Sequence, residues 1–391
     1  MEAAYIVAGK RTPIGAFNGA LATVPAPKLA ATALKAALEQ AGLEPQVVEE
    51  LYVGNVLSAN MGQAPATQVA VHAGLPASVV CTLINKVCAS GTKAVMLAAQ
   101  SIMLGERQIV AACGMENMSL VPHYVPHYRT GYKYGNVELL DGIVRDGLQD
   151  VYSGMMMGMA GELCAEKYGI GRKEQDDYAV RAYRSAAAAY ERGYFADEIV
   201  PVVVEGKKGA ATVDKDEEPA NVRYDKIPEL RPAFKKDGTI TAANASKIND
   251  GAAALILASE TAVKKYNLRP MARVAGFADA AREPEWFTVA PADAVPAAAK
   301  KAGLSLGQID VFEINEAFSV VALVNQKLMD IPDEKLNPNG GAVSLGHPIG
   351  CSGARLALTL ARGLKEKNAR YGAVGICNGG GGASALVLEA V

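Results

Sequence analysis

Four short segments of the sequence hold residue types that could do chemistry together, and the first contains Cys88. This cysteine falls between a strand-like run, 79–83, and an apolar helical pattern, 92–104. The N-terminus of a helix carries partial positive charge and free N–H groups, which stabilise a thiolate. Small residues after Cys88 leave room for a substrate carbonyl. We expect Cys88 to be a nucleophile, and the alternative is a buried structural cysteine.

The second segment is a glycine-rich loop, 340–350, that contains His347 and precedes a helical pattern near Cys351. The other histidines lie in an apolar helical pattern or in the polar region 119–245: His72, His123 and His127. His347 is therefore the best placed general base for Cys88. A histidine that only bonds its own loop is the alternative. Zinc fits poorly, because no cysteine pair accompanies the two histidines of the polar region.

The third and fourth segments add a second thiol and a polar cluster. Cys377 follows a strand pattern and precedes four consecutive glycines, 379–382. Such glycines let backbone N–H groups converge on a charged atom, as in an oxyanion hole. No Lys-Ser/Thr pair follows, which excludes a P-loop. Glu313, Asn315 and Glu316 stand before an apolar helical pattern. These three residues form either a helix cap or part of a site. Cys377 likewise has two interpretations, a structural cysteine or a reactive one.

Two similar halves are expected to position these segments. Three pairs of matching segments recur in the same order, at offsets between 261 and 264 residues. They are the Ala-Gly-Leu triplets 41–43 and 302–304, the Ser-Gly pairs 90–91 and 352–353, and Cys113 with Cys377. Repeated helix patterns alternating with short Val/Ile-rich runs predict two α/β halves with parallel or mixed sheets.

The region between the halves, 119–245, differs in composition. It holds 37 of the 80 charged residues and 11 of the 15 tyrosines, which is typical of a surface subdomain that covers a site. An amphipathic helix is predicted over 172–192, with related faces formed by Tyr178, Ala182, Tyr183 and Ala186. The charge run 214–218 predicts a solvated loop. The lysine pairs 207–208, 235–236, 264–265 and 300–301 are expected at the surface.

Composition excludes several classes of protein. The 391 residues are 50% hydrophobic and 6% aromatic, with a formal net charge of −2. These values disfavour disorder and general attraction to nucleic acid or anionic membranes. We expect no signal, transit or peroxisomal segment, and no membrane span, because no apolar run reaches about 18 residues. We expect reduced thiols and a cytoplasmic location, or a mitochondrial one if a presequence was trimmed.

Taken together, N-K-V-C-A-S-G, N-E-A-F, G-G-A-V-S-L-G-H-P-I-G-C-S-G-A-R and C-N-G-G-G-G-A resemble the motifs of the thiolase family, across the whole chain. The resemblance is strongest to its acetyl-CoA acetyltransferases of eukaryotic type. It implies a five-layered αβαβα fold from two βαβαβαββ halves with an inserted loop domain. The halves would be 1–118, completed by 246–266, and 267–391. The CoA-binding loop domain would be 119–245.

The resemblance also implies a reaction, the condensation of two acetyl-CoA to acetoacetyl-CoA and its reversal. It assigns a role to each of six residues: Cys88 as nucleophile, His347 as proton acceptor, Cys377 as base toward the second substrate, Asn315 as holder of a water, the Gly379 amide beside that of Cys88 as an oxyanion hole, and Glu316 as orienting His347 or that water. The alternatives are a 3-ketoacyl-CoA thiolase that accepts a broader range of acyl chain lengths and a non-catalytic carrier with the thiolase fold. The carrier would be expected to lack one of the four residues Cys88, His347, Asn315 and Cys377.

Substrate and ion contacts follow from the same resemblance. The expected CoA-binding residues, apart from the cleft-lining methionines, are Ser246 at the pantetheine, Lys226 and Arg223 near the adenine and phosphate end, and Phe318 and Tyr183 in the cleft. Asn221 stands where relatives have Arg. Met156, beside Met157 in the cleft, stands where many relatives have His, which bears on substrate range. K⁺ is expected on Tyr183 and the carbonyls of Ala242, Ala243, Ala245 and Val343, with water as the alternative. We expect no bound organic cofactor. We also expect the protein to form a homotetramer.

Overall fold

One mixed ten-stranded sheet joins the two halves of the chain in the computed structural model, which describes residues 2–206 and 209–391. The strand order is β12-β13-β14-β11-β1-β10-β5-β3-β4. The N-terminal half contributes β1 (Ala4–Arg11), β3 (Glu50–Gly54), β4 (Val80–Ile84), β5 (Ile109–Asn117) and β10 (Asn249–Ser259), with β2 (Gly15–Ala16) paired to β10. The C-terminal half contributes β11 (Ala272–Ala281), β12 (Val311–Ile314), β13 (Tyr371–Asn378) and β14 (Gly382–Ala390).

The sheet is parallel only where helices connect its strands. β3 runs parallel to β4 and β5, and β12 runs parallel to β13, while the remaining pairs are antiparallel. The halves meet at a short antiparallel contact of β1 with β11, where Tyr5 faces Arg273 and Ile6 faces Ala272. The expectation of mixed sheets is confirmed.

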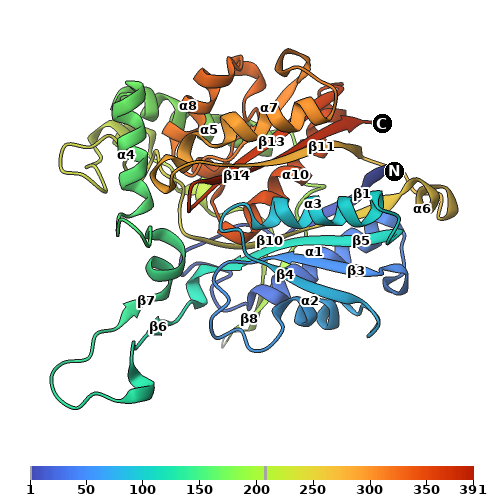
Figure 1. Ribbon diagram of the computed structural model, residues 1–391, viewed down its shortest axis with the longest axis horizontal. Helices are drawn as coiled ribbons and strands as arrows, with labels where there is room; N and C mark the ends of the chain where they lie inside the picture. Colours follow the sequence, from blue (N-terminus) through green and yellow to red (C-terminus); the bar gives the residue numbers. More distant parts are fainter. Residues whose placement is uncertain (1, 207–208) are drawn as a thin grey trace.

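Helices form the other layers of the expected αβαβα arrangement (Figure 1). α1 (Ala26–Ala41) and α2 (Pro65–Ala73) cover one outer face. α3 (Ser90–Met103) and α10 (Ile349–Glu366) pack between the two half-sheets, so nearly every residue of α10 is buried. α7 (Pro291–Lys301) covers the other outer face beside α8 (Ser319–Met329). The remaining helices of the halves are α6 (Glu260–Lys265) and α9 (Ala342–Leu345). Across the described residues, no helix combines the length and apolar character that crossing a membrane requires.

The matching segments of the sequence occupy matching elements. The triplets 41–43 and 302–304 follow α1 and α7, where Gly42 and Gly303 adopt left-handed φ values of 65° and 74°. Only glycine takes this conformation without steric cost, so it ends both helices. Cys113 lies in β5 and Cys377 in the corresponding β13. The repeat therefore reflects two copies of one α/β unit.

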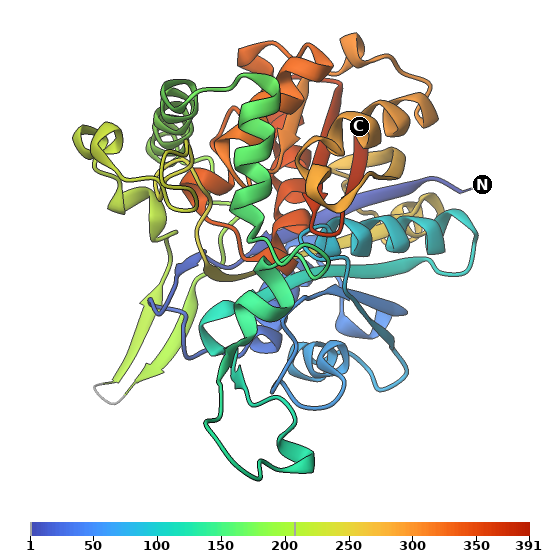
Figure 2. The ribbon, with the colours of Figure 1, turned by 60° about the vertical axis from the view of Figure 1, so that its left-hand side comes forward.

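The segment between the halves forms helices and two hairpins that extend from the layers (Figure 2). It contains α4 (Met157–Tyr168), α5 (Arg172–Glu191), the hairpin of β6 (His123–Tyr124) with β7 (Leu140–Asp141), and that of β8 (Val202–Gly206) with β9 (Gly209–Val213). The helix predicted over 172–192 is confirmed as α5, with Tyr178, Ala182, Tyr183 and Ala186 buried.

Short 3-10 or π turns occur along the whole chain, at Pro45–Val47, Met118–Leu120, Tyr128–Thr130, Val144–Leu148, Glu218–Asn221, Tyr224–Glu229, Pro284–Val289, Leu306–Gln308 and Asp333–Lys335.

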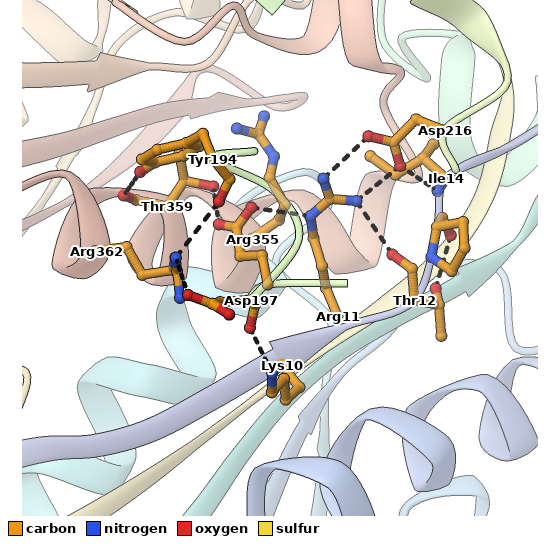
Figure 3. A network of polar contacts seen from close by, with 12 residues as sticks. Lys10, Arg11, Thr12, Ile14, Tyr194, Asp197, Asp216, Arg355, Thr359 and Arg362 are labelled. Carbon is orange, nitrogen blue, oxygen red and sulfur yellow. Dashed lines mark hydrogen bonds and ion pairs between the residues drawn. The ribbon is translucent and has the colours of Figure 1, made fainter. Parts of the chain in front are cut away.

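The charge run 214–218 is not the solvated loop that the sequence predicted. Asp216 is buried and binds the fully buried Arg11 through two bonds of 2.7 and 3.0 Å (Figure 3). Arg11 also donates to Glu198 at 3.2 Å, and the Ile14 amide donates to Asp216 at 2.7 Å. A planar guanidinium forms a bidentate pair with a carboxylate. The composition of a charged segment does not predict such a pair. The run therefore anchors the insert to β1.

The other charged positions in that region behave as expected. Asp214 and Lys215 are exposed, as are the lysine pairs 235–236, 264–265 and 300–301. The pair 207–208 lies outside the described residues.

Replacing Asp216 by asparagine should destabilise the fold. The change keeps the shape but leaves Arg11 buried with only part of its compensating charge, and breaking a buried pair costs about 3–5 kcal/mol. Urea unfolding monitored by circular dichroism would measure the loss. Asp177→Asn is the matched control, because it removes the carboxylate of an exposed pair with Lys173 on α5 and should leave the midpoint unchanged. Equal midpoints for the two variants would contradict the anchoring role.

Candidate active site

Cys88 lies in a strained turn between β4 and α3. The residue before it, Val87, has φ 46°, a left-handed conformation that a β-branched side chain rarely adopts. The turn is held by three hydrogen bonds: Val87 N to Asn85 Oδ1 (3.0 Å), Lys86 N to Ser90 Oγ (2.8 Å) and Ser90 Oγ to the Val87 carbonyl (2.6 Å). Such strain persists only where surrounding contacts enforce it. The turn therefore sets the position of the Cys88 thiol.

A lysine that the sequence did not single out ties this turn to the other half. The Lys86 ammonium binds Asp279 at 2.9 Å, Ser384 Oγ at 2.8 Å and the Ala383 carbonyl at 3.1 Å. These partners belong to β11 and β14, and Ala383 is paired in register with Cys377. The two cysteine-bearing segments are thus fixed relative to each other through Lys86. A cysteine such as Cys88 is recognised in a sequence because its thiol is reactive. The hydrogen-bond partners of a single lysine cannot be recognised in this way.

The Cys88 thiol is protonated in this geometry. Burial raises its pKa to about 12, although the backbone amides of Gly379 and of Cys88 itself hydrogen-bond the sulfur and lower the pKa. The amides favour a thiolate, as the sequence predicts for the start of α3, but loss of hydration outweighs them in the protein without substrate. The same two amides do lie where the resemblance places an oxyanion hole.

The four glycines after Cys377 serve different purposes. Gly380 and Gly381 adopt left-handed φ values of 81° and 88° in the turn between β13 and β14. A Cβ at Gly381 would overlap the Arg282 carbonyl. Gly379 alone directs its amide to Cys88. Turn geometry and close packing therefore account for part of the run, beside the convergence of amides that the sequence predicted.

Cys377 is fully buried in β13. Burial raises the pKa of its thiol well above the ordinary value, and the nearby thiols of Cys88 and Cys164 raise it further. The effect of the Cys88 thiol on the pKa of Cys377 places the two sulfurs near each other, one from each half of the repeat. A protonated thiol beside the nucleophile can exchange a proton with a substrate lying between them.

His347 follows α9 and has its imidazole buried. Its Nδ1 lies 2.6 Å from Ser352 Oγ, and that hydroxyl donates to the Pro348 carbonyl at 2.9 Å. Ser352 therefore accepts from Nδ1–H, which leaves Nε2 as the proton-accepting atom. Burial, with a smaller contribution from the charge of Arg355, lowers the pKa of His347 to about 3. The ring is neutral at pH 7, as a general base must be. Its Ser352 partner was not foreseen.

Asn315 stands at the end of β12, beside His347. Its Nδ2 lies 3.5 Å from His347 Nε2, and its backbone amide donates to the Gly375 carbonyl at 2.8 Å. The buried Oδ1 of Asn315 has no hydrogen-bond partner among the described residues. A buried carbonyl oxygen is costly without a partner, so this atom is suited to hold a water or a polar substrate group.

Glu316 makes no hydrogen bond to His347 in the described structure, and the alternative that it orients the water on Asn315 stays a prediction. Among the described residues its carboxylate accepts from Tyr178 OH at 2.7 Å, Asn337 Nδ2 at 2.8 Å and the Val343 amide at 2.9 Å. The carboxylate also fills the space beside Gly341, where a Cβ would meet it at 2.4–2.5 Å. Glu316 therefore holds α9 in place, and α9 in turn positions the loop that carries His347.

Glu116 is another buried carboxylate that the sequence did not reveal. It accepts from Asn55 Nδ2 at 2.7 Å, from the amides of Val56 and Leu57 at 3.1 Å, and from the Gly350 amide at 2.9 Å. Burial raises its pKa to about 7. These bonds hold the start of α10, directly after His347, against the N-terminal half.

A cleft of about 650 Å³ opens beside the Cys88 turn. Its lining includes Val87, Gly379 and Gly380 from the two halves, and Arg145, Asp146, Tyr152 and Met157 from the insert. Met157 Sδ lies 3.6 Å from where a Cβ on Gly379 would sit. Asn85 and Ser58 also reach this space. The cleft is large enough for a thioester and the arm that carries it.

The other predicted substrate contacts are not among the residues that line this cleft. Met156 precedes α4 and is half-buried, and Phe318 packs edge-on against Phe234. Ser246 Oγ donates to the Ala317 carbonyl at 2.8 Å. Arg223 and Lys226 are exposed, and Lys226 pairs with Glu229 at 3.0 Å. Neither of these two lines the cleft beside Cys88, so they remain predictions for the outer end of a long substrate.

Three of the predicted K⁺ ligands surround a lysine instead. The Lys247 ammonium donates to Tyr183 OH, the Val343 carbonyl and the Ala245 carbonyl at 2.5, 2.9 and 3.1 Å. It makes no hydrogen bond to the carbonyls of Ala242 and Ala243. Burial lowers the pKa of Lys247 to about 8, which leaves it mostly protonated at pH 7. The residues present therefore do not fit K⁺, because a cation already takes its ligands.

Comparison with known proteins agrees with this geometry. The family model "Thiolase, N-terminal domain" matches residues 4–261, and "Thiolase, C-terminal domain" matches residues 268–390. Acetyl-CoA acetyltransferase 2 of Arabidopsis thaliana is 55% identical over 387 residues, covering 98% of this chain and 96% of that one. A cytosolic acetyl-CoA acetyltransferase of Gibberella zeae is 52% identical over 387 residues, with 98% of each chain covered.

Solved structures show the same fold. A thiolase of Ascaris suum in complex with coenzyme A superposes over the full length of both chains, with a TM-score of 0.94 at 42% identity. The motifs around Cys88, His347, Asn315 and Cys377 thus occur on the fold that the resemblance implied. From the family models, the identities and the fold together, this chain belongs to the thiolase family.

Proposed function

We propose that the protein is an acetyl-CoA C-acetyltransferase, which condenses two acetyl-CoA into acetoacetyl-CoA and CoA and also catalyses the reverse thiolysis. The observation that carries the proposal is a pair of neighbouring thiols at the turn beside the cleft, together with a neutral imidazole that lies next to an unpartnered amide oxygen. The relatives at 52–55% identity are named acetyl-CoA acetyltransferases. No residue of this set is replaced, which argues against a non-catalytic carrier.

In the first step the Cys88 sulfur attacks the acetyl thioester. The Cys88 proton passes to Nε2 of His347, and the C–S bond to CoA breaks. The departing CoA thiolate takes the Cys377 proton, so the step ends with acetyl-Cys88, a His347 imidazolium and a Cys377 thiolate. The amides of Cys88 and Gly379 stabilise the tetrahedral oxyanion. The opposite charges on His347 and Cys377 offset part of the cost of burying each.

In the second step the Cys377 thiolate removes a methyl proton from a second acetyl-CoA. The resulting carbanion forms a C–C bond with the acetyl carbon on Cys88, and the Cys88 sulfur leaves. That sulfur recovers its proton from the His347 imidazolium, so every group returns to its starting state. The enolate oxygen is stabilised by the imidazolium and by a water held on Asn315, whose Oδ1 is free to accept.

The insert is proposed to bind the CoA portion. Met156 and Met157 would flank the acyl end, and Ser246 and Phe318 the pantetheine arm. Arg223 and Lys226, both exposed, would meet the phosphates. We also propose a homotetramer, to be tested by light scattering. The cytoplasmic location is supported by the cytosolic name of the Gibberella relative.

Mass spectrometry of the intact protein tests the proposal. Brief incubation with acetyl-CoA should add one acetyl group, and peptide mapping should place it on Cys88 rather than on Cys81 of β4. Acetoacetyl-CoA thiolysis should exceed that of longer 3-ketoacyl-CoA esters. Faster cleavage of the longer esters would favour the alternative, a thiolase that accepts a broader range of acyl chain lengths. Absence of any acetylation, or an acetyl group on another cysteine, would contradict the assignment.

A further inference from the structure

The Lys247 side chain ends in a cage of three oxygen atoms. Its Nζ lies 2.5 Å from Tyr183 OH, 2.9 Å from the Val343 carbonyl and 3.1 Å from the Ala245 carbonyl. An ammonium has three N–H donors and no acceptor, so these three acceptors satisfy it completely. The carboxylates of Glu218 and Glu316 lie close enough to stabilise its charge. The cage is built for one positive charge.

The three oxygens come from segments that converge on the candidate active site. Tyr183 belongs to α5 of the insert, and Ala245 immediately precedes Ser246. Val343 lies in α9, whose end leads to His347. The Val343 amide donates to Glu316 at 2.9 Å, so this residue is held by a carboxylate on one side and by the ammonium on the other. A cation here joins the insert to the His347 loop.

The cage atoms are also ligands that a monovalent metal ion would take. Carbonyl and hydroxyl oxygens coordinate hard cations without contributing charge of their own. A metal ion placed among the same three oxygens would face the ammonium at ligand distance, and two like charges this close repel strongly in a buried site. The lysine and the ion are therefore mutually exclusive occupants.

We propose that Lys247 is a covalently attached substitute for a monovalent metal ion, so that the enzyme needs no K⁺. The ammonium positions the His347 loop and the Ser246 segment permanently, without dependence on ion concentration. Lys247 acts through these segments and is a positioning residue. The activity arm of the test below rests on the proposed acetyltransferase function, while the melting arm rests only on the cage.

The wild-type protein supplies the first arm. Thiolysis and thermal melting are measured at pH 7 and constant ionic strength in the chlorides of K⁺, Na⁺ and tetramethylammonium. Equal activity and equal melting temperature in all three salts are expected. Specific activation by K⁺ together with a K⁺-dependent rise in melting temperature would overturn the proposal. Failure to detect thiolysis in every salt would refute the function instead, and the melting comparison would still decide about the cage.

Two substitutions supply the second arm. Lys247→Ser removes the ammonium and leaves space for an ion, whereas Lys247→Met fills the space with an uncharged chain. In tetramethylammonium chloride, Lys247→Ser should lose about 10- to 100-fold in kcat/KM, since small displacements of positioning segments have effects of this size. K⁺ should restore most of the loss and raise the melting temperature by binding the folded state. Lys247→Met should stay impaired in every salt.

Lys335→Ser is the matched control. Lys335 is also half-buried and donates to a backbone carbonyl, that of Ile309 at 2.8 Å, away from the cage. This variant should show no salt preference in activity or melting. A fully active Lys247→Ser without response to K⁺ would overturn the proposal, as would equal rescue of Lys335→Ser. If Lys247→Ser does not fold in tetramethylammonium, recovery of folding in K⁺ supports the proposal, and failure to recover in either salt counts against it.

Discussion

Replacing Cys88 by alanine is expected to lower kcat for acetoacetyl-CoA thiolysis by roughly 10⁴- to 10⁶-fold, the range seen when a covalent nucleophile is removed. Every step of the proposed cycle passes through the Cys88 sulfur, and the geometry offers no substitute. Cys377 is fully buried, and burial together with the neighbouring thiol keeps its pKa high. The acetylated protein should disappear with the activity. Rapid quenching followed by mass spectrometry measures both in one sample.

Cys81→Ala is the matched control for this change. Cys81 is a half-buried thiol on β4, in the same chain segment, and donates a hydrogen bond to the Val79 carbonyl at 3.6 Å. The control should keep its activity and its acetylation. An acetyl group that persists in Cys88→Ala would show that another residue is the nucleophile, and the assignment of Cys88 would have to be abandoned.

Replacing Cys377 by alanine should separate the two halves of the reaction. Condensation is expected to slow by about 10²- to 10⁴-fold, which is the usual contribution of a general base. Acetylation of Cys88 should continue, because a CoA thiolate is a good leaving group even when no acid protonates it. The measurements are acetoacetyl-CoA formation from acetyl-CoA and, separately, the rate at which the acetylated protein appears.

Cys164→Ala is a suitable control, since Cys164 is a fully buried thiol in the same apolar cluster as Cys377. Both variants lose one buried sulfur, so a loss of packing would affect them alike. Only Cys377→Ala should accumulate acetylated protein without condensing it. Comparable condensation rates in the two variants, with both proteins folded, would remove Cys377 from the mechanism.

Much of the fold followed from local patterns. The end of α1 and the end of α7 share an Ala-Gly-Leu triplet because the same left-handed turn closes both helices. The periodicity of α5 was visible because one stripe of a surface helix must be apolar. The turn at Cys88 and the loop at His347 stood out because glycine and small residues cluster where backbone geometry is demanding.

Charged residues were the positions where local patterns failed. Asp216 lies in a run that is indistinguishable from a solvated loop, and its burial depends on Arg11, which is 205 residues away. Glu316 was expected to orient His347 or a water on Asn315, and the hydrogen bonds that it makes go to Tyr178, Asn337 and Val343. A charged side chain is buried only when a partner compensates it, and the partner is found by the fold rather than by proximity in sequence.

The repeated α/β architecture, the family and the identity of the residues that could react all follow from residue types at short spacing, which can be recognised without coordinates. The state of those residues depends on contacts that form on folding. Burial makes the Cys88 thiol protonated rather than a thiolate. The contact of Lys247 with oxygens of Tyr183, Ala245 and Val343 replaces an expected metal ion with an ammonium. Protonation and ion occupancy depend on hydration and on charges brought together from distant segments, and neither is written in a local pattern.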